Sequence, residues 1–229
     1  MMDRKTVLCL LCYFSFMIAG SVRWPVGSYT LVKPDTGCPE GWYDGWREQD
    51  TEDVSNQNRW TRRNHFYDAG RYFSDSSLRF YYCTKTPYNY YGRGHWPKGD
   101  YCILRQTYYC PKGFREGTVR WDDEDYVNGN DYKEYVPAGT FDDDTEIEYC
   151  CRNDGYYGTA IELPTERPFY LLRFRGYCQL VKGMYVIEEY VYSDDEDFNN
   201  KNRVSGAYPS DAGGSDHKLY YCYYYKKYY

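Results

Sequence analysis

The apolar positions of this chain occur mainly as short aromatic runs and not at helical spacing. Tyr, Val and Thr cluster in runs that Gly, Pro, Asp and Asn interrupt, and the chain beyond residue 21 shows no sustained 3.6-residue periodicity. Aromatic and β-branched side chains favour strands. The pattern therefore predicts a mostly β fold with three similar strands that end in cysteine, at Phe80–Cys83, Ile147–Cys150 and Leu219–Cys222.

The first residues have the pattern of an export signal. Arg4 and Lys5 precede an apolar run from Val7 to Ile18, and small side chains follow at residues 19–21. This run is too short for a stable membrane anchor, and no later segment approaches the roughly 20 apolar residues that a span needs. We expect residues 1–21 to be a secretory signal peptide, and residues 22–229 to form a secreted, extracellular domain without a membrane span.

One acidic, Asn-rich motif occurs three times at a constant spacing. The pattern Asp-x-Glu-Asp-x-x-Asn-x-Asn begins at Asp50, Asp122 and Asp194, which are 72 residues apart. A second motif, Trp-Pro-x-Gly-x-Tyr, begins at Trp24 and Trp96, again 72 residues apart, and should open a strand. Motifs that recur together at such a period indicate repeated structural units.

The repeat predicts the architecture. We expect a single domain of three units, at about 24–95, 96–162 and 163–229. Three units can form an open row or close around a pseudo-threefold axis. Closure is favoured because it protects edge strands that would otherwise pair with other molecules.

The cysteines follow the same repeat. Cys9 and Cys12 lie in the signal segment, which leaves eight cysteines, an even number that is typical of disulfides in a secreted chain. Each unit has an opening and a closing cysteine, and the middle unit has two more. The expected bridges are Cys38–Cys83, Cys110–Cys150, Cys178–Cys222 and Cys102–Cys151. Neighbours on a strand point to opposite faces, so Cys150 and Cys151 need different partners.

The acidic motif permits two interpretations. Asp and Asn side chains cap turns by accepting hydrogen bonds from nearby backbone amides. Carboxylates are also calcium ligands, although the spacing does not match an EF-hand. Capping is favoured, because a motif that recurs in every unit is more simply explained by the structure that the units have in common than by a function. The calcium candidates are Asp50, Glu52, Asp53, Asp122, Glu124, Asp125, Asp194, Glu196 and Asp197, and no other cofactor is expected.

Catalytic signatures are weak. No Gly-x-Ser-x-Gly motif or Gly-rich phosphate loop occurs, and adjacent carboxylates do not single out a glycosidase pair. His95 and His217 are expected at the surface or in turns. An enzyme is therefore not expected, with a glycosidase as the weakest alternative. The net charge of −6 argues against nucleic acid as a partner.

Aromatic surface remains as the candidate binding feature. The chain contains 32 Tyr, and most should pack against neighbouring strands. Tyr beside Asn, Gly and Arg forms adaptable binding surfaces. The candidate ligand-binding residues are Tyr90, Tyr91, Arg93, Tyr156 and Tyr157.

Several long motifs resemble one family. They include Trp96–Leu104, Trp121–Asp125, Cys150–Gly155 and His217–Tyr224, and together they are similar to the apextrin C-terminal domain of secreted invertebrate proteins. The resemblance covers nearly the whole chain beyond the signal segment. It implies an extracellular recognition protein of innate immunity that binds bacterial cell-wall glycopeptide of the peptidoglycan or muramyl peptide type. It implies no pore-forming activity, since the pore-forming-type domain that precedes this one in the original apextrins finds no room here.

The resemblance also implies a link to extracellular matrix and cell adhesion. The Tyr excess and the Tyr-Lys tail favour this alternative, because tyrosines can be cross-linked. The expected partner is thus a microbial cell-wall glycan or glycopeptide, or else a matrix component.

Overall fold

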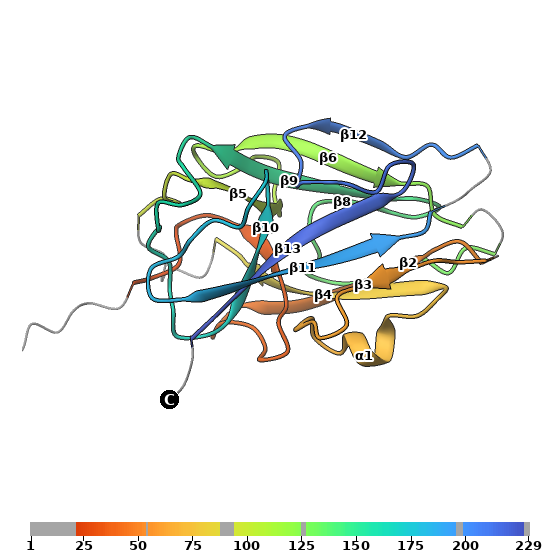
Figure 1. Cartoon of the computed structure of the whole chain (residues 1–229), viewed down its shortest axis with the longest axis horizontal. Coiled ribbons are helices and arrows are strands. Elements are labelled where there is room, and N and C mark those ends of the chain that lie inside the picture. The colour runs from red at the N-terminus through yellow and green to blue at the C-terminus, as the bar shows by residue number, and fades with distance from the viewer. Residues whose placement is uncertain (1–21, 54, 88–93, 125–126, 196–198, 227–229) are drawn as a thin grey trace, which may run out of the picture.

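The protein is mostly β (Figure 1). The computed structural model describes residues 22–53, 55–87, 94–124, 127–195 and 199–226, so the expected signal segment lies outside it. The elements are β1 (Tyr29–Val32), β2 (Tyr43–Asp50), β3 (Arg59–Trp60), α1 (Ala69–Tyr72), β4 (Ser77–Lys85), β5 (Asp100–Arg105), β6 (Arg115–Trp121), β7 (Asp131–Lys133), β8 (Gly139–Phe141), β9 (Thr145–Asn153), β10 (Phe169–Arg173), β11 (Tyr185–Ser193), β12 (Arg203–Gly206) and β13 (His217–Tyr225). Within these ranges, no helix has the length and apolar character needed to cross a membrane.

The same antiparallel arrangement occurs in each of the three sequence segments. β4 lies between β1 and β2, β9 lies between β5 and β6, and β13 lies between β10 and β11. The short buried strands also meet, because β5 pairs with both β1 and β10. One hydrogen-bonded network of strands therefore runs through all three segments.

Each segment also contributes a short strand to a neighbouring segment. β7 of segment 96–162 pairs with β2, and β12 of segment 163–229 pairs with β6. β3 of segment 24–95 pairs in turn with β11. The three pairings thus connect the segments in a cyclic order: the second to the first, the third to the second and the first to the third.

The opening motif forms a turn before the strand and not the strand itself. In the first segment, β1 begins only at Tyr29. Gly27 adopts a φ of 115°, a backbone conformation that residues with a side chain rarely adopt. Pro25 has no N–H for strand pairing. The Tyr29 hydroxyl donates to the carbonyl of Pro25 at 2.9 Å, which closes the turn.

Four disulfides staple the fold, and they are the four predicted from the repeat. They join Cys38 to Cys83, Cys102 to Cys151, Cys110 to Cys150 and Cys178 to Cys222. Cys102 and Cys151 are directly opposed in β5 and β9. Cys151 faces one hydrophobic cluster and Cys150 faces another, as the alternation of side chains along a strand requires.

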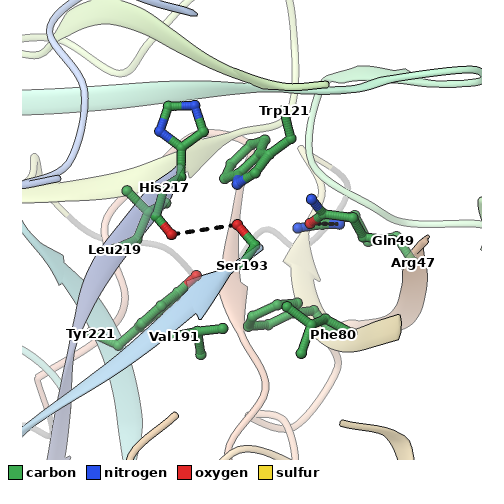
Figure 2. Close-up of a pocket in the computed structure, with 10 residues that line it drawn as sticks. Arg47, Gln49, Phe80, Trp121, Val191, Ser193, His217, Leu219 and Tyr221 are labelled. Atoms are coloured by element: carbon green, nitrogen blue, oxygen red, sulfur yellow. Dashed lines mark hydrogen bonds between the residues drawn. The ribbon is translucent and has the colours of Figure 1, made fainter. Parts of the chain in front are cut away.

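Two buried polar side chains, Arg47 and Gln49, line a cavity of about 10 Å³ (Figure 2). Arg47, which is 2 % exposed, donates from Nε to the Tyr82 hydroxyl at 2.9 Å and from Nη1 to Gln49 Oε1 at 3.0 Å. Gln49 Nε2 donates to Asp123 Oδ1 at 2.8 Å. Gln49 thus links a buried cation to a buried carboxyl group, and the cavity has room for about one water.

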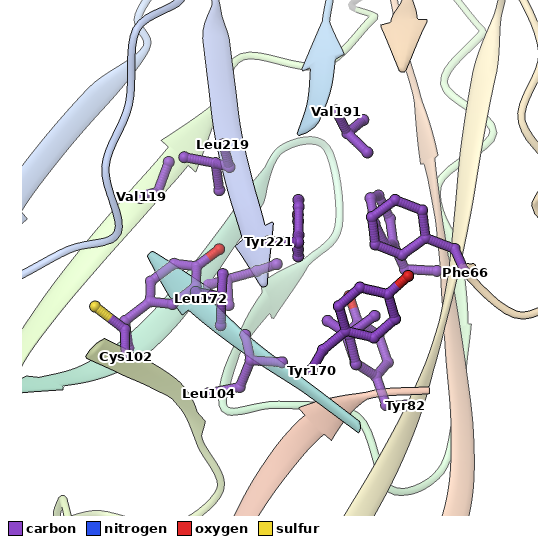
Figure 3. Close-up of a cluster of buried hydrophobic side chains, with 14 of the residues drawn as sticks. Phe66, Tyr82, Cys102, Leu104, Val119, Tyr170, Leu172, Val191, Leu219 and Tyr221 are labelled. Atoms are coloured by element: carbon purple, nitrogen blue, oxygen red, sulfur yellow. The ribbon is translucent and has the colours of Figure 1, made fainter. Parts of the chain in front are cut away.

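Aromatic rings from all three segments fill the surrounding interior (Figure 3). Phe66 stacks on Tyr170 with ring centroids 4.9 Å apart and meets Tyr221 edge-to-face at 5.0 Å. Tyr170 donates its hydroxyl proton to Glu189 at 2.6 Å. The tyrosines therefore supply apolar area to the core while their hydroxyls keep hydrogen-bond partners.

Candidate functional site

The acidic boxes (residues 50–58, 122–130 and 194–202) bind one another through their first aspartates. In each box that aspartate accepts a backbone N–H from a different box at 2.6 Å: Gly129 donates to Asp50, Lys201 to Asp122 and Gln57 to Asp194. The boxes were expected to cap their own turns, and their middle asparagines do: Asn56 accepts the backbone N–H of Asn58 at 2.7 Å, and Asn128 and Asn200 make the equivalent contact at 2.8 Å. Their first aspartates instead join loops that are far apart in the sequence.

The last asparagine of each box completes the connection. Its Oδ1 accepts the backbone N–H of the first aspartate in another box: Asn130 from Asp50 at 2.7 Å, Asn202 from Asp122 at 2.6 Å and Asn58 from Asp194 at 2.9 Å. The second box is thereby bound to the first, the third to the second and the first to the third. The hydrogen bonds form a closed cycle.

Carboxylates of the acidic boxes accept hydrogen bonds from backbone amides. Glu124 Oε2 accepts from the Asp53 backbone amide at 3.1 Å, in addition to the aspartate contacts above. A calcium ion would compete with these amides for the same oxygens. Of the calcium candidates, Asp125, Glu196 and Asp197 lie outside the described residues.

A metal-like grouping occurs elsewhere, at Cys38, Asp44 and Cys83. Both cysteines of this group are joined to each other in a disulfide. Their sulfur atoms are consumed in that bond, and so the group has no thiolate with which to bind a metal ion.

Ser193, His217 and Asp211 lie close together but are not arranged for nucleophilic catalysis. His217 was expected at the surface, yet it is 5 % exposed in β13. Its Nε2 donates to the Arg120 carbonyl at 2.8 Å, and its Nδ1 is hydrogen-bonded to Asp211 at 2.5 Å. Ser193 donates to the His217 backbone carbonyl at 3.4 Å and not to the ring (Figure 2). The imidazole, bonded at both nitrogens, joins β13 to β6 and to Asp211 in the loop before β13, and it is not placed to accept a proton from Ser193.

An open groove of about 630 Å³ lies beside the opening turn of the first segment. That volume is typical of small-molecule sites. Trp24 and Trp42 line it, with ring centroids 5.2 Å apart and planes at 62°. Both rings are half-buried, so part of each faces solvent. Such rings offer apolar area for a ligand that is itself partly apolar.

Charged side chains surround the two indoles. Arg23 and Arg167 are exposed cations of the lining, and Glu40 and Glu166 are exposed anions. The fifth charged residue, Lys85, is 4 % exposed and sits at the end of β4. Its Nζ donates to the Gly27 carbonyl at 3.0 Å and lies 5.7 Å from the Tyr29 ring centroid. Burial lowers the pKa of this ammonium group.

A second aromatic surface lies around Tyr157. Its ring centroid is 4.5 Å from that of Tyr156 and 4.8 Å from that of Tyr177. Tyr156 and Tyr177 are 63 % and 62 % exposed. The sequence predicted Tyr156 and Tyr157 as surface residues but gave no indication of Tyr177. The other predicted ligand residues, Tyr90, Tyr91 and Arg93, fall outside the described ranges.

The groove was not predicted. Trp24 and Trp42 were recognised only as landmarks of the repeat, and Lys85 carries no motif of its own. One signal was available in the sequence. The residue two positions after the closing cysteine is a cation in two segments and a neutral ring in the third: Lys85 after Cys83, Arg152 after Cys150 and Tyr224 after Cys222.

Comparison with known proteins identifies the family of the chain. No curated protein and no solved structure matches the chain. A family model described as the C-terminal domain of apextrin matches residues 24–224. This range contains all four disulfides, the three acidic boxes and the two indoles of the groove. The chain belongs to the apextrin C-terminal domain family.

Proposed function

We propose that the protein is a secreted recognition protein that binds bacterial cell-wall glycopeptide in the Trp24–Trp42 groove, and that it is not an enzyme. The groove is the observation that carries this proposal. It combines two partly exposed indoles with three cations, Arg23, Lys85 and Arg167. The apolar faces of sugar rings can pack on indoles, while the cations suit the carboxylates of a muramyl peptide. The disulfides and the family are consistent with an extracellular protein.

Retention on insoluble peptidoglycan at physiological salt tests the proposal. We expect wild-type protein to be retained and Trp42→Ala to be lost from the pellet, because the variant removes one wall of the groove. Phe114→Ala is a matched control: Phe114 follows Gly113 as Trp42 follows Gly41, and it is likewise partly buried. A wild-type protein that stays in the supernatant would exclude the recognition function.

We further infer that residues 24–95, 96–162 and 163–229 are three units of one domain, arranged about a pseudo-threefold axis. Two observations support this. The short strands β3, β7 and β12 each pair with a strand of another segment, in a cyclic order. The hydrogen bonds between the acidic boxes follow the same order. The three segments would therefore close on themselves and would not form an open row.

An extracellular matrix or adhesion role is the second candidate. The observation in its favour is the exposure of Tyr108 and Tyr109, at 87 % and 80 %. Such rings are accessible to an oxidant and to other molecules. Tyrosine cross-links at these two positions, found by mass spectrometry of protein from its native source, would support a matrix role; unmodified tyrosines would count against it.

A further inference from the structure

We propose that Lys85 is the anchor for a carboxylate group of the ligand that enters the Trp24–Trp42 groove. The inference rests on the proposed function, because it assigns the charge that is recognised at the same site. It comes from comparing Lys85 with the residues at the same position in the other two segments.

The middle segment shows the same position with a carboxylate in place. Arg152 stands two residues after Cys150, as Lys85 stands two residues after Cys83. Its Nε and Nη2 donate to the two oxygens of Asp154, at 2.8 and 2.5 Å. Asp154 Oδ1 also accepts the backbone N–H of Gly99 at 3.3 Å. The carboxylate thus lies between a cation and a glycine amide.

The first segment has the cation and the glycine but lacks this carboxylate. Pro87 stands two residues after Lys85, where Asp154 stands two residues after Arg152. Gly27 occupies the place of Gly99 in the Trp-Pro-x-Gly motif, and its carbonyl accepts the Lys85 ammonium directly. In the first segment, Pro87 therefore supplies no carboxylate at the position where Asp154 pairs with Arg152 in the middle segment, and a ligand carboxylate can take that role.

Lys85 has donors to spare for such a group. Across the described ranges, its ammonium makes the hydrogen bond to Gly27 and no ion pair. An ammonium group carries three donors, and a buried cation without a counter-charge is costly. Burial also lowers the pKa of Lys85, because the charged form loses its contact with water. A ligand carboxylate would remove that cost.

The third segment shows that a charge at this position is not required for folding. Tyr224 stands two residues after Cys222, and its hydroxyl donates to the Gln179 carbonyl at 2.5 Å. The position therefore holds a neutral ring in one segment, a completed ion pair in another and an ammonium without a carboxylate in the segment that supplies both indoles of the groove.

The position of Lys85 favours it over the other cations of the groove. Arg23 and Arg167 are exposed, so water and salt screen their attraction for an anion. Lys85 lines the groove while 96 % of its surface is covered, given that 4 % is exposed. Charge attraction is stronger where water is excluded. The anions Glu40 and Glu166 are exposed as well, so solvent also screens their repulsion of a ligand carboxylate. This repulsion is therefore weaker than the attraction of the carboxylate by the buried Lys85.

The test compares sugars that differ in a carboxylate. N-acetylglucosamine is neutral, N-acetylmuramic acid carries a lactyl carboxylate, and muramyl dipeptide carries a peptide carboxylate. Binding is measured by calorimetry, and the Lys85 pKa by NMR of its ammonium group. We expect at least one of the two carboxylate ligands to bind about tenfold or more tightly than the neutral sugar and to raise the Lys85 pKa. The ligand that does so identifies which carboxylate is recognised.

Variants of the same position sharpen the result. Lys85→Met should lose the preference for the carboxylate, and Lys85→Arg should retain most of it. Pro87→Asp supplies a carboxylate from the chain, in the manner of Asp154, and should compete with the ligand. Lys112→Met, at an exposed lysine outside the groove lining, is the control and should change the preference less than twofold. Lys85→Met should melt no lower than wild type, since it removes an unpaired buried cation.

The outcomes separate this proposal from the proposed function. Retention on peptidoglycan together with an unchanged preference in Lys85→Met would overturn the role of Lys85 and leave the recognition function intact. If the protein is not retained on peptidoglycan but the Lys85 pKa still rises on addition of N-acetylmuramic acid, the recognition function is overturned and the role of Lys85 as a carboxylate anchor stands. If neither carboxylate ligand raises the pKa, Lys85 is not the anchor.

Discussion

Asn130 accepts the backbone N–H of Asp50 at 2.7 Å, across 80 residues of sequence. This contact is one member of a cycle of three, and it explains why the acidic boxes recur. Each box needs an acidic residue to receive amides from one neighbour and an asparagine to receive an amide from the other. A repeated motif therefore acts here as a joint between segments.

The joint can be tested at Asn58, which is 8 % exposed. Its Nδ2 donates to Thr51 at 2.6 Å and to the Ser74 carbonyl at 3.2 Å, in addition to the contact with Asp194. Asn58→Ala should lower the free energy of unfolding by about 2–4 kcal/mol, because buried partners lose their hydrogen bonds. Urea denaturation measures the change.

Gln57→Ala is the control for that variant. Gln57 is exposed, and its side-chain oxygen accepts a surface hydrogen bond from Arg59 at 2.9 Å, so we expect a change within about 0.5 kcal/mol. Equal losses in the two variants would mean that the contacts of Asn58 are not what holds the boxes together.

Stability should fall as pH rises from about 4 to 7. Burial raises the pKa of Asp123 from 3.8 to about 7. The pKa of Asp195 is also raised, mainly by burial and to a smaller extent by the negative charge of the nearby Asp123. In this window the folded state holds protons that the unfolded state has released. The free energy of unfolding therefore decreases with pH, by up to about 1.4 kcal/mol per unit for each such group.

Urea denaturation at pH 5.0 and 7.0 measures this slope. Asp123→Asn should flatten it, since the variant removes one of the titrating groups. Asp154 does not interfere, because its hydrogen bonds with Arg152 hold its pKa at about 2, below the window. A stability that rises between the two pH values would contradict the burial of protonated carboxyl groups.

Chelation should leave the melting temperature unchanged. The box carboxylates already accept backbone amides from neighbouring boxes, so folding does not need a cation at these loops. Differential scanning fluorimetry with EDTA, and then with added calcium, checks this. A melting temperature that falls with EDTA and recovers with calcium would instead assign the boxes to metal binding.

The extra bridge of the middle segment should contribute to stability. Cys102→Ala with Cys151→Ala opens a connection between residues 49 apart in sequence, which should cost about 2–4 kcal/mol. Peptide mapping without reduction should recover the Cys102–Cys151 pair from wild type. A peptide that links Cys102 to Cys110 would contradict the pairing.

The strands, the disulfides and the family could be predicted because they depend on local chemistry and on spacing. Aromatic runs between turn residues favour strands, and equal spacing made Cys38 and Cys83 partners. His217 was misplaced for the opposite reason. Its neighbours Asp216 and Lys218 are polar, as at a surface, but β13 turns its ring inward against the Arg120 carbonyl.

The sequence by itself determined that the chain is a disulfide-linked, mostly β protein of the apextrin C-terminal domain family, in which an acidic motif occurs three times. Only the tertiary structure decided where the acidic boxes find their partners and which side chains form the groove. The partners of Asp50 lie about 80 residues away, and Trp24, Lys85 and Arg167 come from distant parts of the chain. Spacing reports which residues are equivalent between units, whereas contacts between units depend on how the strands pair in space.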